Sequence, residues 1–179
     1  MEPQLAGQWF RSQTPYGPLF HAALRPGAEN SGKMVTMVRQ QARLLAMDED
    51  YPLVLVDGPP GIGCPVISAL AGTDLALIVS EPSLAGIHDL ERAWGVAQHF
   101  GRPCLVCINK ADIYPQGSAI IEAFCSERQI EMVGSIPFDT AVTHAMRAGL
   151  PVTSLGDAPV ARAMRGVWER LLSRLEGLV

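Results

Sequence analysis

The sequence has 179 residues, of which 48% are hydrophobic and 18% are charged, and its formal net charge at pH 7 is −4. This length and composition indicate a folded domain of ordinary size and exclude a disordered chain. The weakly negative charge gives no electrostatic basis for binding nucleic acid or an anionic membrane. No apolar run approaches the roughly 20 residues that span a bilayer, and the N-terminus lacks the pattern of a signal peptide. We therefore expect a cytoplasmic location.

The cysteines are scattered along the chain, which is typical of reduced thiols in a cytosolic protein rather than of a disulfide framework. They are Cys64, Cys104, Cys107 and Cys125. Cys104 and Cys107 have metal-ligand spacing, but they lie in an apolar run that predicts a strand over residues 104–108. Residues three apart on a strand point to opposite faces, so this pair cannot chelate one ion. We predict two core thiols.

Residues 1–26 are rich in proline and aromatic side chains, and we expect an irregular segment there, with at most a short strand over residues 19–24. The folded domain is expected over residues 27–179.

Residues 27–33 match the G-x-x-x-x-G-K pattern of a phosphate-binding loop. Such a loop carries a hydroxyl after the lysine to hold magnesium, whereas this sequence has Met34. We favour a helix start capped by Asn30 or Ser31. Two alternatives stay open: a secondary anion contact by Lys33 and the free N–H groups, and a degenerate but working phosphate loop.

From residue 51 onwards, strand-like apolar runs alternate with helical patterns. Strands are expected over residues 53–56, 75–79, 104–108 and 132–136, and helices over 65–71, 85–100, 118–128 and 140–148. A further helix is expected after residue 33, and a last helix is expected to begin with Asp157 as its N-cap and to end near residue 175. This alternation predicts an α/β fold, in which helices cover both faces of a parallel sheet.

Three of these strands end in polar residues, and the carboxyl ends of parallel strands meet at the edge where ligands bind. Asp57 ends the first strand, and a turn with Gly61 and Gly63 gives backbone N–H groups access to an anion. Taken alone, Asp57 is equally well explained as a capping residue of a buried strand.

Residues 109–112 read Asn-Lys-Ala-Asp and follow the third strand. In this pattern an amide and a carboxylate read the edge of a purine base while the lysine stem covers its ring, although Asn and Asp are also common turn residues. A GTPase would carry Asp-x-x-Gly at the earlier strand, where this sequence has Pro60 in place of the glycine. That difference argues against the small-GTPase plan.

Taken together, these residues resemble the MinD/ParA/Mrp-type P-loop ATPases, specifically the MinD-superfamily members with an inserted ferredoxin domain. The matching stretches are residues 16–24, 29–39, 56–65, 80–90, 108–112 and 135–139. The resemblance implies a P-loop-type α/β fold that binds ATP or ADP with magnesium, and work linked to iron–sulfur or redox protein maturation.

The resemblance also implies roles for individual residues. Asp57 resembles the acid that holds the water shell of the magnesium ion, and Gly61 resembles the glycine whose N–H senses the γ-phosphate. Asn109 resembles the residue that contacts adenine, and Pro137 begins the loop that lies against the base. Asp112 stands where GTPases obtain guanine specificity, and its role in an ATP-type family stays open. We assign no catalytic residue.

Members of this family begin with a strand and a Lys-Gly-Gly-x-Gly-Lys-Thr loop, usually followed by a ferredoxin insert with two four-cysteine runs, and this sequence has neither. By resemblance, residues 27–33 correspond to the segment after the insert. We therefore expect the C-terminal portion of such an ATPase, without the P-loop strand, whether natural, split or truncated. Alone it should not hydrolyse ATP, and it should act as a homodimer or with a chain that supplies the loop. An iron–sulfur or redox protein is an expected partner, although the chain has no cluster ligand set. The alternative is a non-catalytic interaction or dimerisation module.

Overall fold

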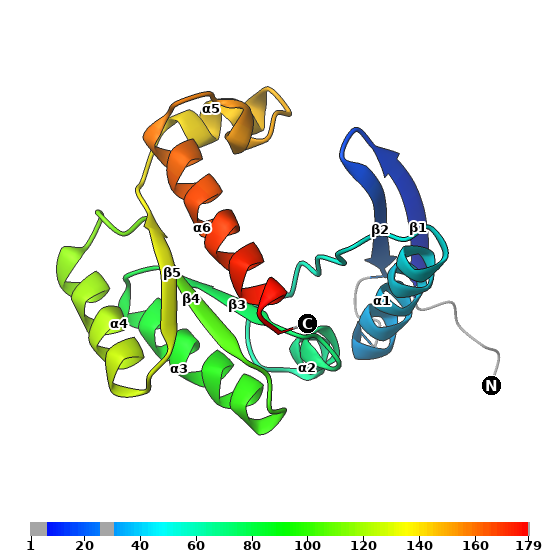
Figure 1. Ribbon diagram of the computed structural model, residues 1–179, viewed down its shortest axis with the longest axis horizontal. Coiled ribbons are helices and arrows are strands. Elements are labelled where there is room, and N and C mark those ends of the chain that lie inside the picture. The colour runs from blue at the N-terminus through cyan, green and yellow to red at the C-terminus, as the bar shows by residue number, and fades with distance from the viewer. Residues whose placement is uncertain (1–6, 26–30, 179) are drawn as a thin grey trace. The chain divides into compact units, whose positions relative to one another are not determined.

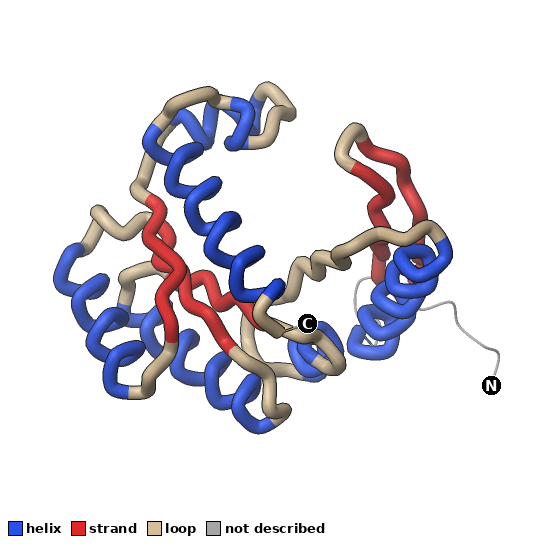
Figure 2. The backbone as a smooth tube through the Cα atoms, viewed as in Figure 1, coloured by secondary structure: helices blue, strands red, loops and turns tan. Residues whose placement is uncertain are grey.

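The computed structural model describes residues 7–25 and 31–178. The chain divides into two compact units, Met1–Gly72 and Thr73–Val179. Figures 1 and 2 show the helices and strands of both units. None of the helices in the described residues is long and apolar enough to cross a membrane.

The first unit contains an antiparallel hairpin and two helices (Figure 1). The hairpin consists of β1 (Gly7–Thr14) and β2 (Gly17–Leu24). The helices are α1 (Ser31–Asp48), which packs against β2, and α2 (Cys64–Leu70), which packs against α1.

The hairpin corrects our expectation that residues 1–26 are irregular. The strands pair without interruption from Gly7 and Leu24 to Thr14 and Gly17. The connecting turn is stabilised by Thr14, whose Oγ1 donates to the Gly17 carbonyl (2.7 Å) and accepts from the Tyr16 N–H (3.1 Å). Gly17 has a φ of 129°, which glycine adopts most readily. The short strand expected over residues 19–24 is confirmed as part of β2.

The strand that we expected over residues 53–56 is not formed. The segment has no regular structure, and Leu55 is 76% exposed. A strand is stable only when its backbone N–H and C=O groups pair with a neighbour. Among the described residues no segment pairs with this one. The segment therefore stays irregular although its sequence is apolar.

The second unit is a parallel α/β structure, as we predicted (Figure 1). Its strands are β3 (Ala76–Ser80), β4 (Cys104–Asn109) and β5 (Glu131–Ile136), in the order β3-β4-β5. Its helices are α3 (Leu84–His99), α4 (Pro115–Glu127), α5 (Ala141–Arg147), the short 3-10 helix η1 (Val152–Ser154) and α6 (Pro159–Glu176). The N-cap of α6 is Ala158, whereas we expected Asp157.

Helices cover both faces of this sheet (Figure 1). On one face, Val106 and Ile108 of β4 pack with Leu90 of α3 and with Ile121 of α4. On the other face, Leu105 and Cys107 of β4 pack with Val133 of β5 and Val167 of α6. β4 is therefore the buried centre of the unit, which explains its nearly continuous apolar sequence.

Side chains of α6 contact the edge strand β5. The register between β4 and β5 shifts at a bulge, where Gly134 adopts a φ of 146°. Arg170 of α6 donates to the Val133 carbonyl at 2.6 Å, and Arg174 pairs with Glu131 at 2.6 Å. Bulges and charged side chains of this kind keep an edge strand from pairing with another chain.

Candidate functional site

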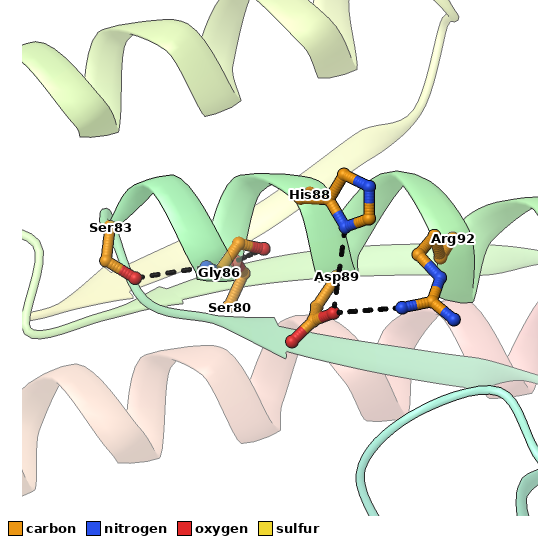
Figure 3. Close-up of polar contacts among 6 residues, drawn as sticks. All are labelled: Ser80, Ser83, Gly86, His88, Asp89 and Arg92. Atoms are coloured by element: carbon orange, nitrogen blue, oxygen red, sulfur yellow. Dashed lines mark hydrogen bonds and ion pairs between the residues drawn. The ribbon is translucent and has the colours of Figure 1, made fainter.

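The turn from β3 into α3 is fixed by short-range contacts (Figure 3). The Ser83 hydroxyl caps α3 by accepting from the Gly86 N–H at 3.0 Å, and the buried Ser80 hydroxyl donates to the Gly86 carbonyl at 2.9 Å. A Cβ on Gly86 would overlap the Glu81 carbonyl oxygen and lie 3.1 Å from its carbon. Only glycine therefore fits at this position without moving the backbone of the turn.

A second glycine holds the same turn from the side of α4. A Cβ on Gly117 would overlap the carbonyl oxygen of Pro82 and lie 2.5 Å from Cδ1 of Tyr114. The Glu81-Pro82 peptide is thus enclosed between the first turns of α3 and α4. Backbone segments approach this closely only where a side chain is absent.

The loop after β4 is tied to this turn by an ion pair. Lys110 Nζ lies 2.6 Å from Glu81 Oε1, and both side chains are partly exposed. Lys110 has a φ of 54°, a left-handed conformation that a residue with a side chain rarely adopts. This conformation begins a turn in which the Ile113 N–H donates to the Lys110 carbonyl at 3.1 Å.

The loops after β4 and β5 are joined by two adjacent hydrogen bonds. The Ala111 N–H donates to the Ile136 carbonyl at 3.0 Å. The Phe138 N–H donates to Asp112 Oδ1 at 2.6 Å. From the other side, the Ser118 hydroxyl of α4 donates to the Ala111 carbonyl at 2.7 Å. The pairing of β4 with β5 therefore continues past the ends of both strands.

Three of the expected site residues lie together at this edge. Asn109 is the last residue of β4 and pairs with Ile136, while Asp112 and Pro137 line a common cavity of about 430 Å³ beside α4. This space is open to solvent and is not an enclosed cavity. The Asn109 carboxamide makes no hydrogen bond to any residue that the structure describes. One oxygen of Asp112, whose role the sequence left open, accepts from the protein's own backbone.

The other two expected site residues, Asp57 and Gly61, share one loop of the first unit. Asp57 is exposed, and no described residue forms an ion pair or hydrogen bond with its carboxylate. Gly61 adopts a φ of 91° and has open space where a Cβ would lie. The glycine is therefore required by the backbone conformation and not by crowding. An unpaired carboxylate and a turn of exposed backbone N–H groups suit a hydrated cation and an anion.

The structure explains Gly32, the second glycine of the phosphate-loop pattern, by helix packing. A Cβ on Gly32 would lie 3.1 Å from Ser68 Oγ and 3.2 Å from the Cβ of Cys64, both on α2. Its absence lets α1 and α2 approach closely. Helix α1 begins at Ser31, which is consistent with the helix start that we favoured. Asn30, the other expected cap, and the rest of residues 26–30 lie outside the described residues.

Of the two thiols that we predicted in the core, Cys107 is buried there and Cys104 is only partly buried. Cys107 is buried in the core on the α6 face, whereas Cys104 lies an odd number of residues away on the same strand and so belongs to the other face. Burial raises the pKa of both thiols to about 11. Among the described residues, no group of three or more His, Cys, Asp or Glu side chains could hold a metal ion.

The polar residues along α3 form an exposed face. His88 Nδ1 lies 4.0 Å and Arg92 lies 3.8 Å from Asp89 Oδ1, and all three side chains are about half exposed or more (Figure 3). Exposed pairs at such distances contribute little to stability. We interpret these residues as a solvated face, not as catalytic groups.

Sequence reasoning missed the residues that position the site: Glu81, Gly86 and Gly117. For Gly86 the available signal was an isolated glycine inside the helix predicted over residues 85–100, whereas Gly117 lies just before the helix predicted over residues 118–128. A glycine inside a helix costs about 1 kcal/mol relative to alanine and usually has a packing reason. The ion pair between Glu81 and Lys110 left no signal, because both residue types are common near strand ends.

No family model matches the sequence. The sequence is similar to the iron-sulfur cluster carrier protein of Pyrococcus furiosus, with 24% identity over 159 residues that cover 81% of this chain and 53% of the relative. It is also similar to a cytosolic Fe-S cluster assembly factor, the Nubp1 homolog of Drosophila pseudoobscura, with 27% identity over 68% of this chain and 45% of the relative. The chain thus spans about half the length of the curated relatives that it matches.

The fold is that of the MinD cell division ATPases. The MinD protein of Aquifex aeolicus superposes with a TM-score of 0.66 at 23% identity, over 79% of this chain and 61% of the other. The MinD protein of Pyrococcus horikoshii, solved with Mg-ADP, superposes with a TM-score of 0.68 at 17% identity, over 88% and 64%. The homologues and the structural neighbours together confirm the resemblance to MinD/ParA-type P-loop ATPases.

Proposed function

We propose that this chain carries two parts of the nucleotide-binding machinery of a MinD-type ATPase that serves iron–sulfur proteins: base-side loops in the second unit and a metal-side loop in the first unit. The observation that carries the proposal is the edge formed by β4 and β5. There the carboxamide of Asn109, which bonds to none of the described residues, ends one strand, and a loop containing Pro137 and held by Asp112 follows the next. An amide offers a donor and an acceptor side by side, which suits the edge of an adenine base.

On the metal side, Asp57 would hold the water shell of a magnesium ion, and the Gly61 N–H would approach the γ-phosphate. The unpaired Asp57 carboxylate and the left-handed Gly61 fit these roles. Magnesium, when bound, neutralises charge on the transferred phosphoryl group. The names of the relatives support the iron–sulfur connection and a cytoplasmic location.

The sequence contains no Lys-Gly-Gly-x-Gly-Lys-Thr loop. Such a loop cradles the phosphates and supplies most of the electrostatic stabilisation of phosphoryl transfer. We therefore propose that a partner polypeptide or a further segment supplies it, and that these 179 residues alone bind adenine nucleotides weakly and do not hydrolyse them.

A second candidate is a module that binds another polypeptide without catalysis. The apolar, unpaired segment over residues 53–56 favours it, because exposed side chains such as Leu55 need a partner to be buried.

Calorimetric titration with Mg-ATP and Mg-GTP, together with a phosphate-release assay, tests the proposal. We expect weak ATP binding in preference to GTP and turnover no higher than background. The result that would contradict us is turnover by the isolated chain that disappears in Asp57→Ala. Binding of neither nucleotide would favour the second candidate.

A further inference from the structure

We propose that Asp112 is a positioning residue, which holds the base-side loop in place and does not read the base. This inference rests on the proposed function, because it concerns the same nucleotide site. Its basis is the contact of 2.6 Å between the Phe138 N–H and Asp112 Oδ1, which joins loops 26 residues apart in the sequence. A hydrogen bond from an N–H to a carboxylate at this distance belongs to the stronger class in proteins.

This contact lies next to the residue that we expect to touch the base, so it can position that residue. Phe138 directly follows Pro137, the residue expected to lie against the base, and no backbone ladder reaches Phe138 because β5 ends at Ile136. The Ala111 N–H donates to the Ile136 carbonyl, and Asp112 accepts from the next backbone donor along the chain, the Phe138 N–H. Proline has no N–H of its own, so the Phe138 N–H is the backbone donor nearest to Pro137 on its C-terminal side. Asp112 therefore fixes the path of the chain through Pro137.

The same contact bears on base recognition. Guanine presents two adjacent donors, N1–H and the C2 amino group, and a carboxylate reads them by turning both oxygens toward the base. Oδ1 of Asp112 already accepts from Phe138, so its orientation is set by the protein. Lys110, which would cover a purine ring in the guanine-reading arrangement, is directed to Glu81 at 2.6 Å. Both side chains of the motif that would select guanine are thus engaged within the protein, which leaves Asn109 to contact the base.

Two substitutions of Asp112 distinguish a role in positioning the loop from a role in recognising the base. Asp112→Asn keeps an oxygen that can accept from Phe138 but loses the carboxylate that guanine requires. Asp112→Ala loses both functions. A positioning role predicts rescue by asparagine, whereas a base-reading role predicts that both variants lose guanine binding. If Asp112 recognised the base, the Asp112→Asn variant would also gain affinity for a xanthine nucleotide. Xanthine carries a carbonyl in place of the amino group, and an amide can donate to it.

The experiment measures amide hydrogen exchange at Phe138 in the nucleotide-free 179-residue chain, followed by NMR titration with ATP, GTP and XTP. We expect Phe138 to exchange roughly tenfold faster or more in Asp112→Ala, in line with the loss of a hydrogen bond to a charged group. Asp112→Asn should restore most of the protection. The same order should hold for ATP affinity, and no variant should prefer GTP or XTP. Protection of the β4 amides reports that each variant is folded.

Unchanged exchange at Phe138 in Asp112→Ala would overturn the inference. So would a wild-type preference for GTP that passes to XTP in Asp112→Asn. If the wild-type chain binds no nucleotide, the proposed function fails, yet the exchange rates still decide whether Asp112 holds the loop. The two failures are therefore distinguishable.

Discussion

Replacement of Gly86 by alanine sets two opposing effects against each other in helix α3. Helix propensity favours alanine over glycine by about 1 kcal/mol in a helix interior. Against this, the new Cβ would overlap the carbonyl oxygen of Glu81 and lie 3.1 Å from its carbon and 3.2 Å from Ser83 Oγ. The overlapping atom belongs to the backbone, so it cannot turn away as a flexible side chain could. Overpacking of this kind costs about 1–3 kcal/mol and occasionally more.

We therefore expect the second unit to lose about 1–3 kcal/mol of unfolding free energy in Gly86→Ala. Gly95 provides a matched control, because it lies in the same helix and a Cβ there would meet nothing within 4 Å. With no clash to offset the propensity, Gly95→Ala should stabilise the unit by about 0.5–1 kcal/mol. The two alanine variants should change stability in opposite directions.

Native-state hydrogen exchange of the buried β4 amides is the appropriate assay, since it reports on the second unit alone. Unfolding of the whole chain would mix the contributions of two units. If Gly86→Ala stabilises the unit as Gly95→Ala does, the close contact between α3 and the Glu81-Pro82 turn is not a constraint. The explanation of how the site is positioned would then be wrong.

Two further predictions concern the edge strand and the core thiols. Arg170→Met keeps an unbranched apolar stem but leaves the Val133 carbonyl without its donor, so we expect the second unit to lose about 1–3 kcal/mol of unfolding free energy, measured by hydrogen exchange of the β4 amides. Arg174→Met removes only the exposed pair with Glu131 and should destabilise the unit much less. A similar loss in both would count against the role of Arg170. Because burial raises the pKa of Cys104 and Cys107 to about 11 from an ordinary value near 9, the folded chain binds these protons more tightly than the unfolded chain. Their contribution to stability is then complete below about pH 9 and declines as the pH rises to about 11. Denaturation of wild type and Cys107→Ala across this range measures it, and an equal pH dependence in both would refute the assignment.

The parts of the fold that the sequence predicted well are those whose structure is determined by local pattern and burial. The apolar run at residues 104–108 became the central strand β4, and the helical periodicity at 85–100 became α3 within one residue at each end. In both, the residues that make the pattern also make the core: Leu90, Val106 and Ile108 are almost fully buried.

The parts that the sequence did not predict depend on partners elsewhere in the chain. The apolar run at 53–56 has the composition of a buried strand, but composition does not determine whether a neighbouring strand is present to pair with it. The hairpin over residues 7–24 was not predicted, because the proline and aromatic residues of this segment suggested irregular structure. Its stability depends on cross-strand pairs such as Trp9 with Phe20, whose rings stack 6.3 Å apart.

The same limit applies to the site. The positions of Asn109, Asp112 and Pro137 at one edge of the sheet could be predicted, because strand ends follow from strand positions. Which acceptor the Phe138 N–H would find was not visible in the sequence, since Asp112 is 26 residues away. The sequence left the role of Asp112 open, and the contact with Phe138 is the basis of our proposal that this residue holds the loop.

The central claim is that this chain contributes the base side of an adenine nucleotide site without its own phosphate loop. The most direct test is an NMR titration of the 179-residue chain with adenosine and, separately, with tripolyphosphate. We predict that adenosine shifts the amide resonances of Asn109, Ile136, Phe138 and Asp139, that Asn109→Ala abolishes these shifts, and that tripolyphosphate leaves them unchanged. Shifts caused by tripolyphosphate alone, with none caused by adenosine, would contradict the account.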